Sequence, residues 1–363
     1  MKSIIESNSA VLDRYFISSV SYEEYLYWIS ERNGFLYRMD TKTNHIELTD
    51  VKWGLASEVP FANGVLLIDD NMLYVLLDFG RRLLKYNIAN GVYEIITVFG
   101  NPFPGYDFSF AKKIGEYIYY LEYNFDFLRR IDTNSGKVEQ IFIHEYKGMK
   151  QDFYYPYIHN QIDDDMYIFV FSENLYYKYD ACKEKKQRYY YPVEIKEPLY
   201  VQVTEEGFYI LTASGEVFLW NGSSRNVIEI FSNNISKHIL KYEYGLLYKI
   251  KNKLWLLPAE GENIICIDLN TKKYDVFKDY PDDFYYTTEF PASKYGYGTL
   301  VNGVIYFAMR KGNYIFSVNE NGEGKFIDAR WPKDCEKQIY IAKNMGECIH
   351  ETEGLMEVFL RRI

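Results

Sequence analysis

The sequence of 363 residues predicts an all-β protein made of seven copies of one four-stranded antiparallel unit. The main observation is a repeat in which an aromatic residue in a short apolar run is followed 12 or 13 residues later by Asp or Asn. The seven pairs are Tyr27 with Asp40, Tyr74 with Asn87, Tyr119 with Asp132, Tyr167 with Asp180, Tyr209 with Asn221, Trp255 with Asp268, and Tyr306 with Asn319. Successive Asp or Asn positions lie 47, 45, 48, 41, 47 and 51 residues apart. A nearly constant inner spacing with a looser outer period is typical of a repeated supersecondary unit joined by variable loops.

The second copy shows the predicted unit most clearly. It contains four apolar runs, at 65–68, 72–77, 83–87 and 92–98, each bounded by Gly, Asn or Asp. Short runs separated by such turn residues are typical of an antiparallel meander. Asn87 ends the third run, and Asn and Asp favour turns because their side chains hydrogen-bond to the backbone two residues further on.

The same order recurs in the other copies. In the first copy we expect strands near 14–20, 25–29, 34–40 and 45–48, and in the third near 108–113, 117–122, 127–132 and 137–142. The seven predicted units cover 12–48, 63–98, 108–142, 157–191, 199–231, 238–277 and 297–328. One such unit cannot bury both of its faces, whereas seven packed around an axis bury them and leave only short, protected edges. We therefore predict a seven-bladed β-propeller with residues 1–330 as a single domain, and an open stack of sheets or a large sandwich as the alternative.

The segment 331–363 departs from the repeat and is assigned to the same domain. A closing strand is expected near 339–342, followed by a short helix whose apolar stripe contains Leu355, Met356, Val358 and Phe359. This tail either packs on the propeller or docks a partner. Either the tail or the N-terminal segment around Ile4 is expected to complete the ring.

Charge and composition restrict the function. The formal net charge of −10 argues against nucleic acid and against an anionic membrane surface as partners, because both require a basic footprint. No apolar run approaches the 18 residues of a membrane-spanning helix, and the N-terminus lacks the apolar region of a signal peptide, so we expect a cytoplasmic protein. The four cysteines show no metal-type spacing and are expected to be free thiols, although a pair between Cys335 and Cys348 stays open.

Two segments resemble known propeller repeats. The stretch from Tyr25 to Ser30, followed by Gly34 to Asp40, is similar to YWTD-type repeats, and the turn after Asp132 is similar to the corner of PQQ-like and Kelch-like blades. The resemblance covers about residues 12–328. The double Gly of Kelch repeats, the Trp-docking motifs of PQQ enzymes and the Gly-His and Trp-Asp signatures of WD40 repeats are absent. The resemblance implies the propeller superfamily, with a central channel and binding on one face.

Aromatic residues gather in the predicted loops between blades. These loops share a face, here called the top face, with the loops between second and third strands, and several contain Pro, which reduces the ordering needed on binding. The candidate ligand-binding residues in or beside them are Trp53, Phe103, Tyr106, Asp107, Tyr154, Tyr155, His159, Tyr285, Tyr286, Tyr295 and Trp331. They either stack on a ligand or pack beneath the loops. The chain holds 38 Tyr and 24 Phe, and most of these are expected to pack between strands.

The longest inter-blade loop, 278–296, combines these aromatics with Asp279, Asp282, Asp283 and Glu289. Carboxylates beside aromatic rings suit the recognition of a cation, an amine or a sugar hydroxyl. The alternative is a solvated acidic loop without a ligand.

Catalytic signals are sparse. His159 and His238 fall near the first strands of the fourth and sixth units, where they would line the channel, but these units are not adjacent. Gly-rich phosphate loops and the G-x-S-x-G motif are absent from the sequence. We therefore expect no cofactor and no metal site.

A basic position lies two residues before the Asp or Asn in the first four units: Arg38, Lys85, Arg130 and Lys178. Each cation is expected either to pair with a carboxylate on a neighbouring strand or to be solvated. If the first four blades share a basic band, an acidic partner would dock on that side.

These observations favour a cytoplasmic binding or scaffold protein that recognises a protein, peptide or glycan through its aromatic top face. The alternative is a cytoplasmic carbohydrate-active enzyme, a lyase or hydrolase, with its site at the channel mouth. A third hypothesis is a subunit of a larger assembly that docks through the C-terminal helix.

Overall fold

The computed structural model describes most of the repeat region. The described residues are 19–29, 36–49, 66–77, 82–99, 108–122, 127–145, 157–159, 165–223, 226–232, 244–259, 261–284, 295–296, 298–309 and 314–328. The predicted closing strand, the C-terminal helix, Cys335 and Cys348 lie outside these residues. Neither Cys182 nor Cys266 forms a disulfide within the described ranges.

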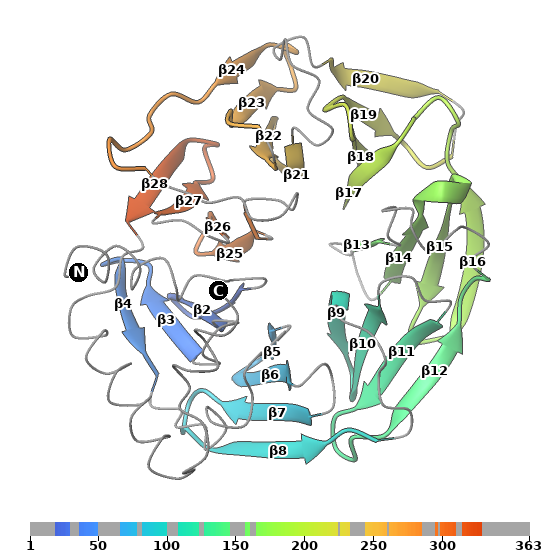
Figure 1. The fold of residues 1–363 in the computed structure, drawn as a ribbon, viewed down its shortest axis with the longest axis vertical. Coiled ribbons are helices and arrows are strands. Elements are labelled where there is room, and N and C mark those ends of the chain that lie inside the picture. Colours follow the sequence, from blue (N-terminus) through green and yellow to red (C-terminus); the bar gives the residue numbers. More distant parts are fainter. Residues whose placement is uncertain are drawn as a thin grey trace, which may run out of the picture.

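Seven four-stranded antiparallel sheets form a ring around a central axis (Figure 1), and this confirms the prediction of a seven-bladed β-propeller. Each sheet, or blade, contains four strands that are consecutive in the sequence, and the first strand of each blade lies nearest the axis.

The first four blades cover the N-terminal half of the ring. Blade 1 contains β1 (Ser19–Tyr22), β2 (Tyr25–Ile29), β3 (Leu36–Asp40) and β4 (His45–Leu48). Blade 2 contains β5 (Leu66–Asp69), β6 (Met72–Leu77), β7 (Arg82–Asn87) and β8 (Tyr93–Thr97). Blade 3 contains β9 (Phe108–Ile114), β10 (Tyr117–Glu122), β11 (Phe127–Asp132) and β12 (Val138–Phe142). Blade 4 contains β13 (Tyr157–His159), β14 (Asp165–Val170), β15 (Leu175–Asp180) and β16 (Lys185–Tyr190), with a short 3-10 helix, η2 (Phe171–Glu173), between β14 and β15.

The remaining three blades complete the ring. Blade 5 contains β17 (Pro198–Thr204), β18 (Gly207–Thr212), β19 (Val217–Trp220) and β20 (Val227–Phe231). Blade 6 contains β21 (Tyr244–Ile250), β22 (Lys253–Pro258), β23 (Ile265–Asp268) and β24 (Tyr274–Val276). Blade 7 contains β25 (Thr299–Val301), β26 (Val304–Ala308), β27 (Tyr314–Val318) and β28 (Gly324–Asp328).

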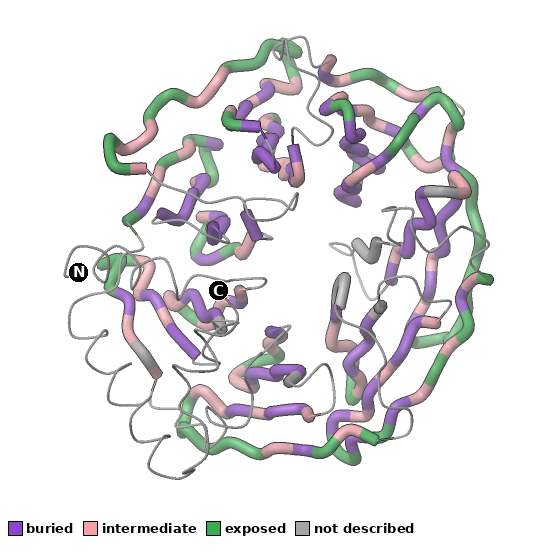
Figure 2. Tube along the Cα trace, viewed as in Figure 1, coloured by how far each residue is buried: buried purple, intermediate pink, exposed green. Residues whose placement is uncertain are grey.

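The core lies between neighbouring blades. Second and third strands are mostly buried, whereas fourth strands are exposed along the circumference (Figure 2). The repeated aromatic lies on the second strand and faces the next blade. Tyr119 packs against Tyr179 with ring centroids 6.2 Å apart, and Trp255 packs against Phe316 at 5.4 Å. Each repeat aromatic therefore contributes its large apolar surface to the joint between two blades.

The repeated Asp or Asn turns the chain from the third strand into the fourth, as the sequence predicts. In every blade its side-chain oxygen accepts a hydrogen bond from a backbone N–H two or three residues further on. Asp132 also accepts one from the Ser135 hydroxyl at 3.0 Å. Both halves of the repeat therefore have structural roles.

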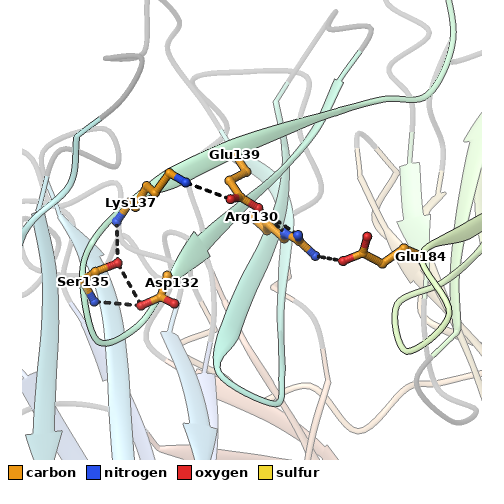
Figure 3. Close-up of polar contacts among 6 residues, drawn as sticks. All are labelled: Arg130, Asp132, Ser135, Lys137, Glu139 and Glu184. Carbon is orange, nitrogen blue, oxygen red and sulfur yellow. Dashed lines mark hydrogen bonds and ion pairs between the residues drawn. The ribbon is translucent and has the colours of Figure 1, made fainter.

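The third-strand cations pair with neighbouring carboxylates, which confirms the pairing alternative. Arg38 contacts Glu47 at 2.5 Å, Lys85 contacts Glu94 at 3.7 Å, Arg130 contacts Glu139 at 2.8 Å, and Lys178 contacts Asp165 at 2.5 Å. Arg130 also reaches Glu184 of the next blade (Figure 3). The first four blades therefore balance these cations locally, and the predicted basic band is neutralised.

The first and last blades meet directly. Ser19 Oγ on β1 lies 2.5 Å from Thr299 Oγ1 on β25, and Thr299 Oγ1 lies 2.9 Å from the Ser19 carbonyl oxygen. Residues of blades 1, 2 and 7 also share one apolar cluster. No helix within the described ranges has the length and apolar character needed to cross a membrane.

Candidate functional site

The sequence assigns the candidate ligand-binding residues to the top face, whose described parts include 143–145, 171–174, 191–197, 213–216 and 277–284. Most of the predicted residues lie outside the described ranges: Trp53, Phe103, Tyr106, Asp107, Tyr154, Tyr155, Tyr285, Tyr286 and Trp331, together with His238 and Glu289. Their roles remain predictions.

Two predicted residues fall on described backbone. His159 ends β13, the innermost strand of blade 4, and pairs in register with Tyr167. Tyr295 is only 2% exposed, forms an isolated bridge with Met309 and packs against Phe316 with ring centroids 6.4 Å apart. For Tyr295 this burial favours the packing alternative over a stacking surface.

The described part of the long acidic loop also packs its aromatics. Phe284 lies against Phe326 with ring centroids 4.8 Å apart, and the Asp283 carboxylate accepts a hydrogen bond from the Tyr314 hydroxyl. The Tyr280 hydroxyl donates to the Glu262 carbonyl oxygen at 3.0 Å. Residues 277–284 therefore attach the loop to blades 6 and 7. The Asp283 carboxylate already accepts a hydrogen bond from Tyr314 within the protein.

A different cluster on the top face joins blades 3 and 4. His144 follows β12 in the loop between these blades, Glu173 lies in η2, and Tyr177 lies on β15. His144 Nε2 is 2.8 Å from Glu173 Oε1, and His144 Nδ1 is 2.8 Å from the Tyr177 hydroxyl. The side chains of His144 and Glu173 are 15% and 32% exposed, so solvent reaches both.

The donors in this cluster follow from its chemistry. A carboxylate can only accept, so His144 Nε2 carries the proton that bonds to Glu173. Burial raises the pKa of Tyr177, while the neighbouring Arg188 acts in the opposite direction. The phenol therefore stays protonated at neutral pH and can donate to Nδ1. Both ring nitrogens are occupied, which orients the imidazole but leaves neither nitrogen to accept a substrate proton.

Lys186 of β16 fixes the start of the same loop. Its ammonium group donates to the carbonyl oxygens of Phe142 and Ile143, at 2.9 and 3.0 Å, and lies 4.8 Å from the centre of the Phe142 ring. Phe142 is nevertheless 51% exposed. Lys186 Nζ also lies 5.9 Å from the centre of the Tyr177 ring. The same ammonium group therefore contacts both the exposed Phe142 and the cluster of His144, Glu173 and Tyr177, here called the blade 3–4 cluster.

Residues 143–156 lie between the third and fourth predicted units, and the sequence singled out Tyr154 and Tyr155 there but not His144. Its partners Glu173 and Tyr177 come from another blade, so they become neighbours only once the blades are packed. In the part of the chain that the structure describes, no group of three or more His, Cys, Asp or Glu side chains is placed to hold a metal ion.

Comparisons with known proteins show similarity at the level of the fold. No protein-family model matches this chain, and no curated protein matches it. A streptogramin B lyase structure has a TM-score of 0.60 and 13% identity, covering 88% of this chain and 95% of its own. YCF48 bound to D1 peptide has a TM-score of 0.58 and 10% identity, covering 83% and 90%. Virginiamycin B lyase from Staphylococcus aureus has a TM-score of 0.54 and 14% identity, covering 83% and 92%. At these identities the similarity shows a shared propeller fold and nothing about a shared ligand.

Proposed function

We propose that this chain is a binding protein that recognises a protein or peptide partner through its top face at blades 3 and 4. The observation that carries the proposal is the blade 3–4 cluster, which presents a partly exposed carboxylate and imidazole beside the exposed ring of Phe142. An apolar ring next to a fixed acceptor suits a polypeptide with an apolar side chain followed by a cationic or amide donor.

The rigidity of the cluster also supports a binding role. His144 is held at both ring nitrogens and Lys186 holds the backbone before it, so little side-chain freedom is lost when a ligand arrives. The similar structure of YCF48 was obtained with a bound peptide, which makes a peptide ligand compatible with this kind of ring. A glycan stays within the proposal through the predicted aromatic loops.

The test begins with a displayed library of random peptides and a glycan array, both probed with the intact chain. Selected ligands are then measured against a His144→Ala, Glu173→Gln double variant. The matched control is Ser214→Ala, Glu216→Gln, a hydrogen-bonded polar pair on the same face of blade 5. We expect the first variant to weaken binding about tenfold or more and the control to stay within about twofold of the parent.

Equal losses in both variants would overturn the assignment to blades 3 and 4. An empty library and an empty array, together with robust turnover of a substrate, would overturn the binding function itself.

A second candidate is a lyase or hydrolase. The order carboxylate, imidazole, phenol in the blade 3–4 cluster favours it, because such an arrangement can orient a general acid or base. Two of the similar structures are lyases. The hydrogen bonds of both His144 nitrogens argue against the enzyme, because neither nitrogen is left to accept a proton from a substrate. Loss of a measured turnover in His144→Gln, with unchanged ligand affinity, would favour the enzyme over the binding protein.

A further inference from the structure

We propose that the outer edge of β16 in blade 4 is a docking strand for an acidic, extended segment of a partner polypeptide, which adds to the blade as a fifth strand. This surface lies on the circumference of the ring, and the proposal does not depend on the ligand of the top face.

The composition of β16 sets it apart from the other six outer strands. Its sequence, Lys-Lys-Gln-Arg-Tyr-Tyr, contains three cations and no carboxylate. Every other outer strand contains one carboxylate, namely Glu47, Glu94, Glu139, Glu229, Asp275 or Asp328. In a chain with a net charge of −10, blade 4 therefore presents a basic strand where the other blades do not.

Exposure also distinguishes this strand. All six residues of β16 are exposed, whereas β8, β12, β20 and β28 each contain a buried residue. β16 is the last strand of its sheet, and among the described residues no strand pairs with its outer edge (Figures 1 and 2). Six residues give an edge about 20 Å long, enough for a full added strand.

The nearby carboxylates are already engaged, so they do not cancel the charge of the strand. Glu184 contacts Arg130 of blade 3 at 2.6 Å, and Asp180 contacts Lys183 at 2.7 Å. Lys186 is committed to the blade 3 backbone. Lys185 and Arg188 are the cations of β16 that are available to pair with carboxylates of a partner. Arg188 lies 5.4 Å from the ring centre of Tyr190.

The edge matches an acidic extended peptide in two ways. Its outward backbone groups provide the hydrogen bonds of strand addition, and its alternating side chains provide selectivity. Lys185 and Arg188 point to opposite faces of the sheet, because side chains alternate along a strand. A row of carboxylates on either face of an added strand would therefore meet a cation, and the exposed ring of Tyr190 would pack on the peptide's apolar residues.

The same charges argue against a second copy of this chain as the occupant. Pairing β16 with itself would bring six cations onto two adjacent strands, and like charges across a strand pair are destabilising. Lysines on an edge strand also protect it from self-pairing. The same cations attract an acidic segment, so the charges that prevent self-pairing favour an acidic partner.

The experiment measures binding of a fluorescein-labelled peptide, acetyl-(Glu-Val)4-amide, to the intact chain by fluorescence anisotropy. Three comparisons accompany it: the (Lys-Val)4 peptide, the acidic peptide N-methylated at its four central residues, and the Lys185→Glu, Arg188→Glu variant. The matched control is Lys272→Glu, Lys273→Glu, which makes the same charge change at exposed positions of blade 6. Because β16 is exposed throughout, we expect every variant to fold, and thermal unfolding verifies this.

We expect the acidic peptide to bind and the lysine peptide not to bind. The β16 variant and the N-methylated peptide should each lower the affinity about tenfold or more, and the blade 6 control should stay within about twofold. Tyr190→Ser should also weaken binding.

Three results would overturn the proposal. Unchanged affinity of the N-methylated peptide would show general electrostatic attraction without strand addition. Equal losses in the β16 and blade 6 variants would show that the strand is not the site. A concentration-dependent dimer that the β16 variant abolishes would assign the edge to a second copy of the chain.

Discussion

Arg130 of blade 3 donates a hydrogen bond to Glu184 of blade 4, with Nη1 and Oε1 2.6 Å apart (Figure 3). The same guanidinium group donates to Glu139 at 2.8 Å and lies 4.5 Å from the centre of the Tyr117 ring. One side chain thus connects two strands of its own blade and the outer turn of the next. It is one of several polar links across this joint, beside those made by Lys186 and by His144.

Replacing Arg130 by Leu, the residue that blade 5 carries at Leu219 in the same row, should cost about 1–2 kcal/mol. Glu184 loses the ion pair with Arg130, and Glu139 keeps only Lys137, at 3.1 Å. Glu184→Gln should cost less than about 0.5 kcal/mol, because Glu184 is 59% exposed and solvent screens the pair. Chemical denaturation of both variants measures the difference, and high salt should reduce it. A Glu184→Gln cost equal to that of Arg130→Leu would contradict this reading.

The turn at Asp132 should make part of the stability depend on pH. The backbone N–H of Ser135, above all, holds the pKa of Asp132 below its ordinary value of 3.8. A pKa that is lower in the folded state contributes stability above 3.8, and this contribution is lost as the pH falls through the folded-state pKa. Asn87 and Asn319 make the same kind of turn without a titrating group.

At neutral pH, Asp132→Ala should cost about 1 kcal/mol, and Asp132→Asn should cost less because the amide oxygen still accepts the turn hydrogen bonds. The stability difference between the parent and Asp132→Asn should shrink as the pH falls below 3.8. Unfolding free energies measured across that range provide the check. A difference that stays constant with pH would mean that the carboxylate charge contributes nothing to this turn.

The joint between blades 6 and 7 depends on the absence of a side chain at Gly324. A Cβ there would lie 2.8 Å from Trp255 Cη2 and 2.7 Å from Phe316 Cζ. Gly324→Ala should therefore destabilise the protein by about 1–3 kcal/mol. Combining it with Trp255→Phe should cost less than the sum of the two single changes, because the smaller ring frees space for the new methyl group. Strict additivity in a double-mutant cycle would show that the two positions are not in contact.

The repeat made the blades predictable because each blade is a local structure. Tyr74 and Asn87 lie 13 residues apart on adjacent strands, so spacing alone revealed the hairpin and its turn. The blade 3–4 cluster depends instead on the packing of separate blades. His144 and Glu173 are 29 residues apart, and nothing in their spacing indicates that they meet. For Tyr295, the loop position left open whether the ring stacks on a ligand or packs beneath the loop. The bridge to Met309 and the contact with Phe316 show that it is packed, at 2% exposure.

The central claim is that the top face at blades 3 and 4 binds a polypeptide, and photo-crosslinking of a selected peptide ligand tests it most directly. With a photoreactive residue in the peptide, the account predicts crosslinks to 142–145 and 171–177 that disappear in the His144→Ala, Glu173→Gln variant. Crosslinks confined to the opposite face, for example to the turns at 41–44 and 269–273, would contradict it.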